Sequence, residues 1–125
     1  TALRVELLRN GPGHFLTPHC DCVEKIISLL IFVNENGQPL NSGTDIYREI
    51  GGEGTTSSTL ERSFDHFEKV EEIPFITGNA LIFHPGMDTW HGLDKMKTFD
   101  DRRLIQINWV SPEYSNHPEC LPVDR

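Results

Sequence analysis

The sequence contains a short pair of possible metal ligands, His19 and Asp21, separated only by Cys20, and a third candidate, His91, much later in the chain. Two imidazoles and one carboxylate form the ligand set that holds non-haem Fe(II) on one face and leaves coordination positions open for chemistry. A His-x-Asp pair alone is weak evidence, because a surface histidine beside a solvated carboxylate gives the same pattern. With His91 added, an oxygen-activating site becomes the leading hypothesis.

The elements that must position these residues are expected to be strands. Side chains two positions apart on a strand emerge on the same face, with their Cα atoms about 6.6 Å apart, so His19 and Asp21 can face one ion while Cys20 points away. Short segments rich in strand-forming residues are separated by turn signals, and they lie at 3–8, 15–23, 25–33, 43–47, 73–76, 80–84 and 104–110. This pattern is typical of an all-β sandwich or barrel.

One long segment interrupts the strand pattern. Residues 51–58 are mostly Gly, Ser and Thr, and charged residues crowd together at 60–72. We expect a mobile loop or lid at about 48–72 that covers a site, because lids use Gly-rich, weakly packed segments. A disordered insertion without function is the alternative.

Composition limits the class of protein. The 125 residues are 37% hydrophobic and fit one domain, 1–125, with its own core. The formal charge of −8 makes nucleic acid and anionic membranes poor partners, and no apolar run approaches the roughly 20 residues that span a bilayer. Three cysteines do not indicate a disulfide framework, so we expect a reducing, cytoplasmic location. Because the chain begins at Thr1 and enters a strand at once, we expect its natural N-terminus to lie outside these residues.

Several segments together resemble the 2-oxoglutarate/Fe(II)-dependent dioxygenase superfamily, and its prolyl-hydroxylase-like branch in particular. They occur in the order of the family and span nearly the whole chain, at 13–21, 43–47, 79–83, 90–92 and 102–105. The resemblance implies a double-stranded β-helix, or jelly roll, of the cupin type, with supporting helices N-terminal to it that this chain lacks. It also implies that His19, Asp21 and His91 bind Fe(II), with 2-oxoglutarate and dioxygen as cosubstrates.

The distal carboxylate of 2-oxoglutarate needs a cation, and the planar guanidinium of arginine provides two parallel hydrogen bonds. Either Arg102 or Arg103 is expected to supply it. The family pattern favours Arg102, with Leu104 at a position that is usually small, and strand alternation gives Arg102 the more polar face. The alternative for each arginine is a surface ion pair with a neighbouring aspartate.

Tyr47 is a further candidate for binding the cosubstrate. Its hydroxyl is expected either to donate a hydrogen bond into the cavity or simply to accompany a ring that fills a strand face. The sequence does not distinguish these two roles.

Two functions from different classes remain open. The first is a dioxygenase that couples oxidative decarboxylation of 2-oxoglutarate to succinate with hydroxylation of a substrate. The second is a jelly-roll binding module in which the metal site is vestigial or structural. The intact ligand group and the arginine favour the enzyme, whereas the substrate, a peptide or a small metabolite, cannot be inferred because one fold hosts many functions.

Overall fold

The structure is a computed structural model of the chain, and it describes residues 2–34, 40–50, 63–97, 101–113 and 120–122. These ranges contain nine strands and one short 3-10 helix, and no α-helix. The elements are β1 (Ala2–Asn10), β2 (Leu16–His19), β3 (Lys25–Phe32), β4 (Leu40–Glu49), η1 (Phe64–His66), β5 (Phe67–Phe75), β6 (Ala80–Phe83), β7 (His91–Leu93), β8 (Arg102–Val110) and β9 (Cys120–Pro122). In the described part of the chain, no helix is long and apolar enough to cross a membrane.

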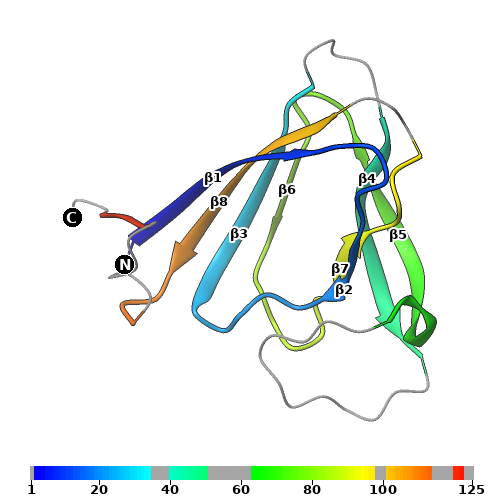
Figure 1. Cartoon of the computed structure of the whole chain (residues 1–125). Helices are drawn as coiled ribbons and strands as arrows, with labels where there is room; N and C mark the ends of the chain where they lie inside the picture. Colours follow the sequence, from blue (N-terminus) through cyan, green and yellow to red (C-terminus); the bar gives the residue numbers. More distant parts are fainter. Residues whose placement is uncertain (1, 35–39, 51–62, 98–100, 114–119, 123–125) are drawn as a thin grey trace.

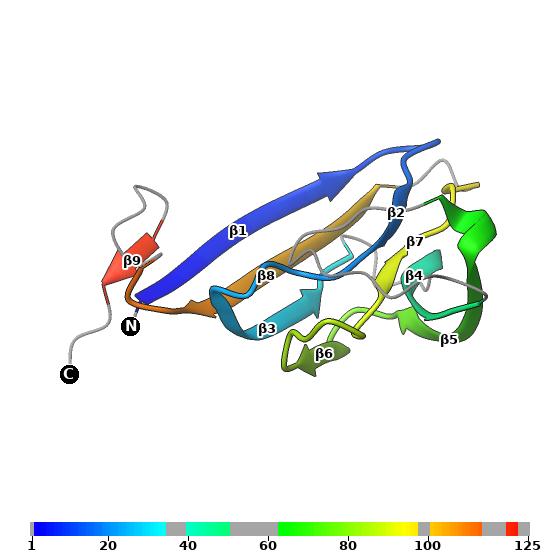
Figure 2. The ribbon, with the colours of Figure 1, turned by 90° about the horizontal axis from the view of Figure 1, so that it is seen from below.

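The strands form two antiparallel sheets that face each other (Figure 1). The five-stranded sheet has the order β6-β3-β8-β1-β9, and the four-stranded sheet has the order β2-β7-β4-β5. Figure 2 shows β9 beside β1 at the far end of the larger sheet. Strands β1 to β8 pass back and forth between the two sheets in the manner of a jelly roll, so the predicted all-β, double-stranded β-helix fold is confirmed.

Alternation along the strands places the core between the sheets. On β3, Leu30 and Phe32 point inward and are buried, whereas Ile31 between them is only half-buried. Phe32 stacks on Phe75 of the smaller sheet, with ring centroids 4.7 Å apart, and Leu104 of β8 completes the cluster. This apolar cluster joins the two sheets and supports the floor of the cavity described below.

The outer face of the larger sheet is also apolar. A row of cross-strand neighbours runs over four strands, from Val5 through Ile107 and Leu29 to Ile82. Val5 and Ile82 are exposed, and the described part of the chain places no α-helix on this face. The predicted supporting helices concern residues outside this chain, so that expectation stays a prediction.

The predicted loop or lid at about 48–72 has the wrong boundaries. Strand β4 continues to Glu49, and β5 begins at Phe67 and pairs with β4 along its length. Residues 51–62, the centre of the predicted lid, lie outside the described residues. The misplaced boundary at Phe67 arises because most of β5 is exposed, so its charged sequence lacks the apolar alternation that indicates a strand.

Candidate metal centre

Strand pairing brings the two predicted histidine ligands together. His19 ends β2 and lies directly opposite His91, the first residue of β7, in an antiparallel pair. Opposed residues of such a pair have Cβ atoms about 4.5–5.5 Å apart. The two imidazole rings accordingly lie with their centroids 4.4 Å apart. Distance in the sequence is therefore no obstacle to a shared site.

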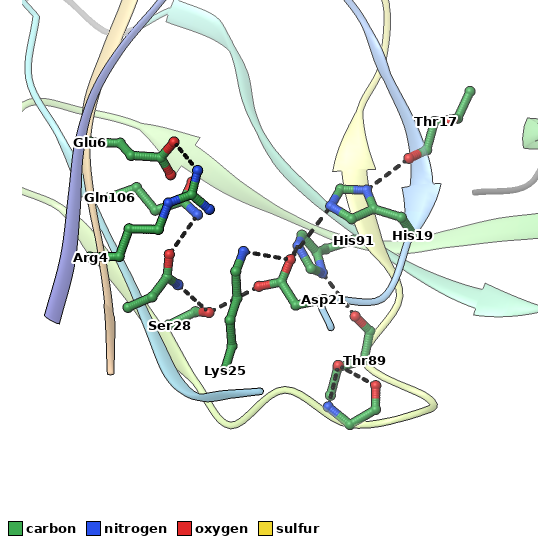
Figure 3. Close-up of polar contacts among 12 residues, drawn as sticks. Arg4, Glu6, Thr17, His19, Asp21, Lys25, Ser28, Thr89, His91 and Gln106 are labelled. Atoms are coloured by element: carbon green, nitrogen blue, oxygen red, sulfur yellow. Dashed lines mark hydrogen bonds and ion pairs between the residues drawn. The ribbon is translucent and has the colours of Figure 1, made fainter. Parts of the chain in front are cut away.

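Asp21 completes the group from the loop that follows β2. Its Oδ1 atom lies 3.8 Å from Nε2 of His19 and 3.7 Å from Nε2 of His91. Figure 3 shows the carboxylate directed at both imidazoles. Its Oδ2 atom accepts a hydrogen bond from the Ser28 hydroxyl at 2.9 Å, and Ser28 in turn accepts one from the Asn108 amide at 2.8 Å. The carboxylate is thus fixed on one side and faces both histidines with the other.

The side-chain alternation predicted for this segment is retained, although the strand is shorter than expected. Strand β2 stops at His19, so Asp21 does not lie within a strand. Cys20 nevertheless points to the opposite side, where it is buried against Tyr47, Phe67 and Trp90. This second apolar cluster anchors the residue between the two ligands and so helps to fix the direction of both.

Backbone carbonyls orient the imidazoles. Nδ1 of His19 lies 3.0 Å from the Thr17 carbonyl oxygen, and Nδ1 of His91 lies 2.8 Å from that of Thr89. Donation of the Nδ1 proton to these carbonyls leaves each Nε2 lone pair free to bind a metal. Burial, with a smaller contribution from His19, lowers the pKa of His91 to about 4, so its imidazole is neutral at physiological pH.

The three residues have the properties that a metal site requires. The ligand atoms of His19, Asp21 and His91 all lie within 4.8 Å of one another. Burial alone would raise the pKa of Asp21, but Lys25, His91 and the hydrogen bond from Ser28 hold it below its ordinary value, so the carboxylate is ionised. Two imidazole nitrogens and one carboxylate oxygen suit a divalent transition metal.

A cavity of about 190 Å³ lies beside this group, between the two sheets. Its polar lining includes the three candidate ligands together with Asn10, Lys25, Thr44, Arg102 and Gln106. Leucine side chains and Phe83 form the apolar part of the wall. The site therefore combines a metal-ligand group with a partly open cavity that can admit a small molecule.

Arg102 is a buried cation in this cavity. Its three nitrogens donate to the Ser42 carbonyl, the Asn10 amide oxygen and the Thr44 hydroxyl, each at 3.0 Å. The guanidinium also lies over the rings of Phe32 and Phe75, 5.6 and 5.3 Å from their centroids. These contacts hold the group firmly in place at the floor of the cavity.

The three acceptors of Arg102 among the described residues are neutral. Among the described residues no carboxylate lies within ion-pair distance of it, although its side chain is almost completely buried. Burial lowers the pKa of Arg102 to about 10 and the more distant Asp45 carboxylate acts in the opposite direction, so the guanidinium remains charged at neutral pH. Asp45 does not line the cavity and is itself paired with Lys69. A buried charge is costly without a counter-ion, and the guanidinium has five N–H donors, of which these bonds use three. The site is thus suited to an anion that enters from the cavity.

Arg103 lies on the other face of β8. Its side chain is 40% exposed, and Nη2 lies 3.5 Å from Oδ2 of Asp101, which also pairs with Arg9. The structure therefore places Arg102 inside the cavity and Arg103 outside it, which is the arrangement that strand alternation predicted for the two arginines.

Tyr47 lies away from the other candidates. Its hydroxyl donates to Asp94 at 2.8 Å and is 3.3 Å from Asp45, and burial together with these two carboxylates raises the pKa of the phenol. It does not line the cavity of the metal-ligand group. The reason is alternation on β4: Thr44 faces the cavity, so Asp45 and Tyr47 face the opposite side. The proposed cavity role of Tyr47 is not supported.

Three cavity residues escaped the sequence analysis. Asn10 and Thr44 hold Arg102 from two other strands, and Lys25 approaches Asp21 from the start of β3. Thr44 could have been found by assigning faces along residues 43–47. Asn10 has no local spacing signal, because its position depends on how β1 pairs with β8. Lys25 follows Asp21 by four residues, but this spacing brings two side chains together here only because the chain bends between β2 and β3.

Comparisons with known proteins support the fold. No family model matches this sequence, and no curated protein matches it. A Pseudomonas putida prolyl-4-hydroxylase superposes with a TM-score of 0.52 and 15% identity, over 88% of this chain and 52% of that one. An uncharacterized conserved Klebsiella pneumoniae protein with a double-stranded β-helix domain gives a TM-score of 0.49 and 12% identity, over 89% and 70%. The chain thus spans about half the length of the hydroxylase.

Together the topology and the side chains define a class. The chain is a double-stranded β-helix protein with a His-Asp-His group within metal-binding distance. At 15% identity the likeness to the hydroxylase concerns the fold, and the chemistry must be argued from the residues of this chain.

Gly92 allows β2 and β7 to approach, and we expect Gly92→Ala to weaken metal binding about tenfold or more. A Cβ atom at this position would lie 2.5 Å from the Leu16 carbonyl oxygen, so β2 would have to move and separate His19 from His91. Calorimetric titration with Zn(II) measures the change. Gly86→Ala is the control, because a Cβ atom there meets only side chains, at 3.4 Å or more. Unchanged metal affinity in Gly92→Ala would contradict this account.

Proposed function

We propose that this chain is an Fe(II)- and 2-oxoglutarate-dependent dioxygenase, in which oxidative decarboxylation of 2-oxoglutarate to succinate is coupled to hydroxylation of a substrate. The observation that supports it most is the pairing, within one cavity, of the His-Asp-His group with a buried arginine that has no carboxylate partner among the described residues. A structural metal site alone would not require this cation, whereas a cosubstrate with a carboxylate requires a cation to bind it.

In this proposal the side chains have distinct tasks. His19, Asp21 and His91 hold Fe(II) and leave positions open for 2-oxoglutarate and dioxygen, and the bound metal supplies the oxygen activation. Arg102 binds the distal carboxylate of 2-oxoglutarate through charge-assisted hydrogen bonds, and the Thr44 hydroxyl beside it is a further donor.

The surrounding residues fix and shield this site. Ser28 and Asn108 hold the far oxygen of Asp21, and the Thr17 and Thr89 carbonyls fix the two imidazoles. Such outer partners orient metal ligands and set their protonation state. The apolar wall of the cavity, with Phe83 in edge contact with His91 at 4.9 Å between centroids, restricts water around the reacting groups.

The comparison supports the proposed reaction class and leaves the substrate open. The Pseudomonas putida neighbour is described as a prolyl-4-hydroxylase, and the same fold here has a ligand group suited to iron.

We propose that residues 1–125 form the catalytic core. Free Cys20 and Cys22 agree with a reducing, cytoplasmic location.

The proposed function is tested by adding Fe(II) and 2-oxoglutarate to the protein without oxygen. We expect the weak visible charge-transfer band of the metal chelate, followed by succinate release when oxygen is admitted. Mn(II) in place of Fe(II) serves as the control, because it occupies similar sites without giving this band or turnover. A folded protein that shows neither signal with Fe(II) is not a dioxygenase.

One observation favours the second candidate function, a binding module with a vestigial or structural metal site. The Lys25 ammonium lies 3.4 Å from Oδ1 of Asp21, the oxygen that faces both histidines. In a vestigial site a lysine could replace the metal as the partner of the carboxylate. Metal titration separates a vestigial site from the enzyme, because a vestigial site would bind Fe(II) and Zn(II) weakly or not at all, whereas a structural site would bind metal but release no succinate.

A further inference from the structure

Lys25 introduces a second cation into the cavity. Lys25 is the first residue of β3, and its side chain is only 11% exposed. This side chain lines the same cavity as Arg102. Figure 3 shows its ammonium directed at the Asp21 carboxylate, next to His91. Asp21 is the only carboxylate of the described residues within ion-pair distance of Lys25.

Metal binding must change the environment of this lysine. Oδ1 of Asp21 is the oxygen nearest to both histidine Nε2 atoms, so it is the atom that a metal would engage. It is also the atom that Lys25 approaches. A divalent ion at the group would take up the negative charge of Asp21 and repel the ammonium. Because the ammonium is mostly buried, it would then need another anion.

The charge of the cavity indicates how much negative charge is missing. Among its lining residues, Asp21, Lys25 and Arg102 have formal charges, which leaves one positive charge in excess when the histidines are neutral. A divalent metal and the doubly charged 2-oxoglutarate cancel each other. The loaded cavity therefore keeps an excess of one positive charge. Because Arg102 binds the distal carboxylate of 2-oxoglutarate in the proposed function, Lys25 is the cation that lacks an anion.

We propose that Lys25 binds a carboxylate of the primary substrate, so that the substrates of this site are small carboxylic acids. This inference rests on the proposed function. A singly charged carboxylate neutralises the loaded cavity, whereas a phosphate monoester has a charge of about −1.5 to −2 at neutral pH and would leave an excess of negative charge. The ammonium lies beside the metal-ligand group, so the bound acid is held next to the centre that oxidises it.

The first test measures the competition between Lys25 and the metal. In Lys25→Met a cation next to Asp21 is removed, and we expect Zn(II) to bind about tenfold more tightly, which corresponds to about 1.4 kcal/mol. Lys97→Met, an exposed lysine outside the cavity, is the matched control and should leave the affinity unchanged. Equal Zn(II) affinity in wild type and Lys25→Met would overturn the inference, because Lys25 would then not respond to the metal.

The second test measures whether the site prefers a carboxylate to an amide, on protein loaded with Zn(II) and 2-oxoglutarate. The probes are phenylacetate, cyclohexanecarboxylate and N-acetylglycine, each compared with its primary amide by ligand-observed NMR. We expect the wild type and Lys25→Arg to prefer the acids, and we expect Lys25→Met to lose at least about tenfold in acid affinity while its amide affinity stays the same. No preference for acids in the wild type, or the same preference in Lys25→Met, would overturn the proposal.

The 2-oxoglutarate affinity decides which carboxylate Lys25 binds. We expect Lys25→Met to change it by less than about threefold. A loss as large as that of the acids would assign Lys25 to the cosubstrate and overturn the substrate role. Failure of the proposed function looks different: Lys25-dependent acid binding would persist on the metal-loaded protein, but 2-oxoglutarate would give neither the chelate band nor succinate.

Discussion

Asp21→Ala is expected to abolish succinate formation and to lower the affinity for Fe(II) more than about 100-fold. Asp21 provides the only anionic donor of the three candidate ligands, and its Oδ1 atom lies within 3.8 Å of Nε2 on both histidines. Its removal also leaves the buried Lys25 ammonium without its carboxylate partner, so the remaining site would repel a cation. Calorimetry measures the metal affinity, and succinate release measures the activity.

Asp101→Ala is the matched control for this change. Asp101 is a carboxylate of the same type that pairs with Arg9 and Arg103 at the surface, and it does not line the cavity. We expect its loss to alter neither metal affinity nor turnover. A folded Asp21→Ala protein that binds Fe(II) as tightly as the wild type would remove Asp21 from the ligand group and with it the proposed site.

The regular strands of this fold follow from local sequence. Strands β1, β3 and β8 are rich in β-branched and aliphatic residues and end at polar or Gly-containing turns, so their positions were predicted to within a few residues. The position of strand β5 was not predicted in this way, because residues Glu68 to Glu72 are exposed and lack an apolar pattern. Pairing with β4 makes these residues a strand. An edge strand of this kind is specified by its partner rather than by its own pattern.

The residues of the candidate site also fall into two groups, those that the sequence indicates and those that only the fold brings together. The His19 and Asp21 pair and the distant His91 could be recognised by residue type and order, and alternation on β8 separated Arg102 from Arg103. The position of Lys25 beside Asp21 could not be recognised, because it depends on the bend of the chain between β2 and β3. The sequence left two roles open for Tyr47, and alternation with Thr44 on β4 places its hydroxyl away from the cavity.

Arg102→Ala is expected to raise the 2-oxoglutarate concentration needed for half-maximal succinate formation about 100-fold. Removal of one partner of a buried charge pair costs about 3–5 kcal/mol, and each 1.4 kcal/mol is a factor of ten, so 100-fold lies just below the lower end of the range. The measurement is the initial rate of succinate release against 2-oxoglutarate concentration. Zn(II) affinity without 2-oxoglutarate should stay the same, because Arg102 contacts none of the three candidate ligands.

Two further variants show whether this effect belongs to the buried guanidinium. Arg103→Ala removes the neighbouring arginine from the exposed face and should change the 2-oxoglutarate requirement less than about twofold, since exposed ion pairs contribute about 0–1 kcal/mol. Arg102→Lys keeps the charge but loses the planar pair of donors, so it should lie between the wild type and Arg102→Ala. The opposite result, a cosubstrate defect in Arg103→Ala and none in Arg102→Ala, would place the carboxylate outside the cavity. That outcome would contradict the role assigned to the interior face of β8.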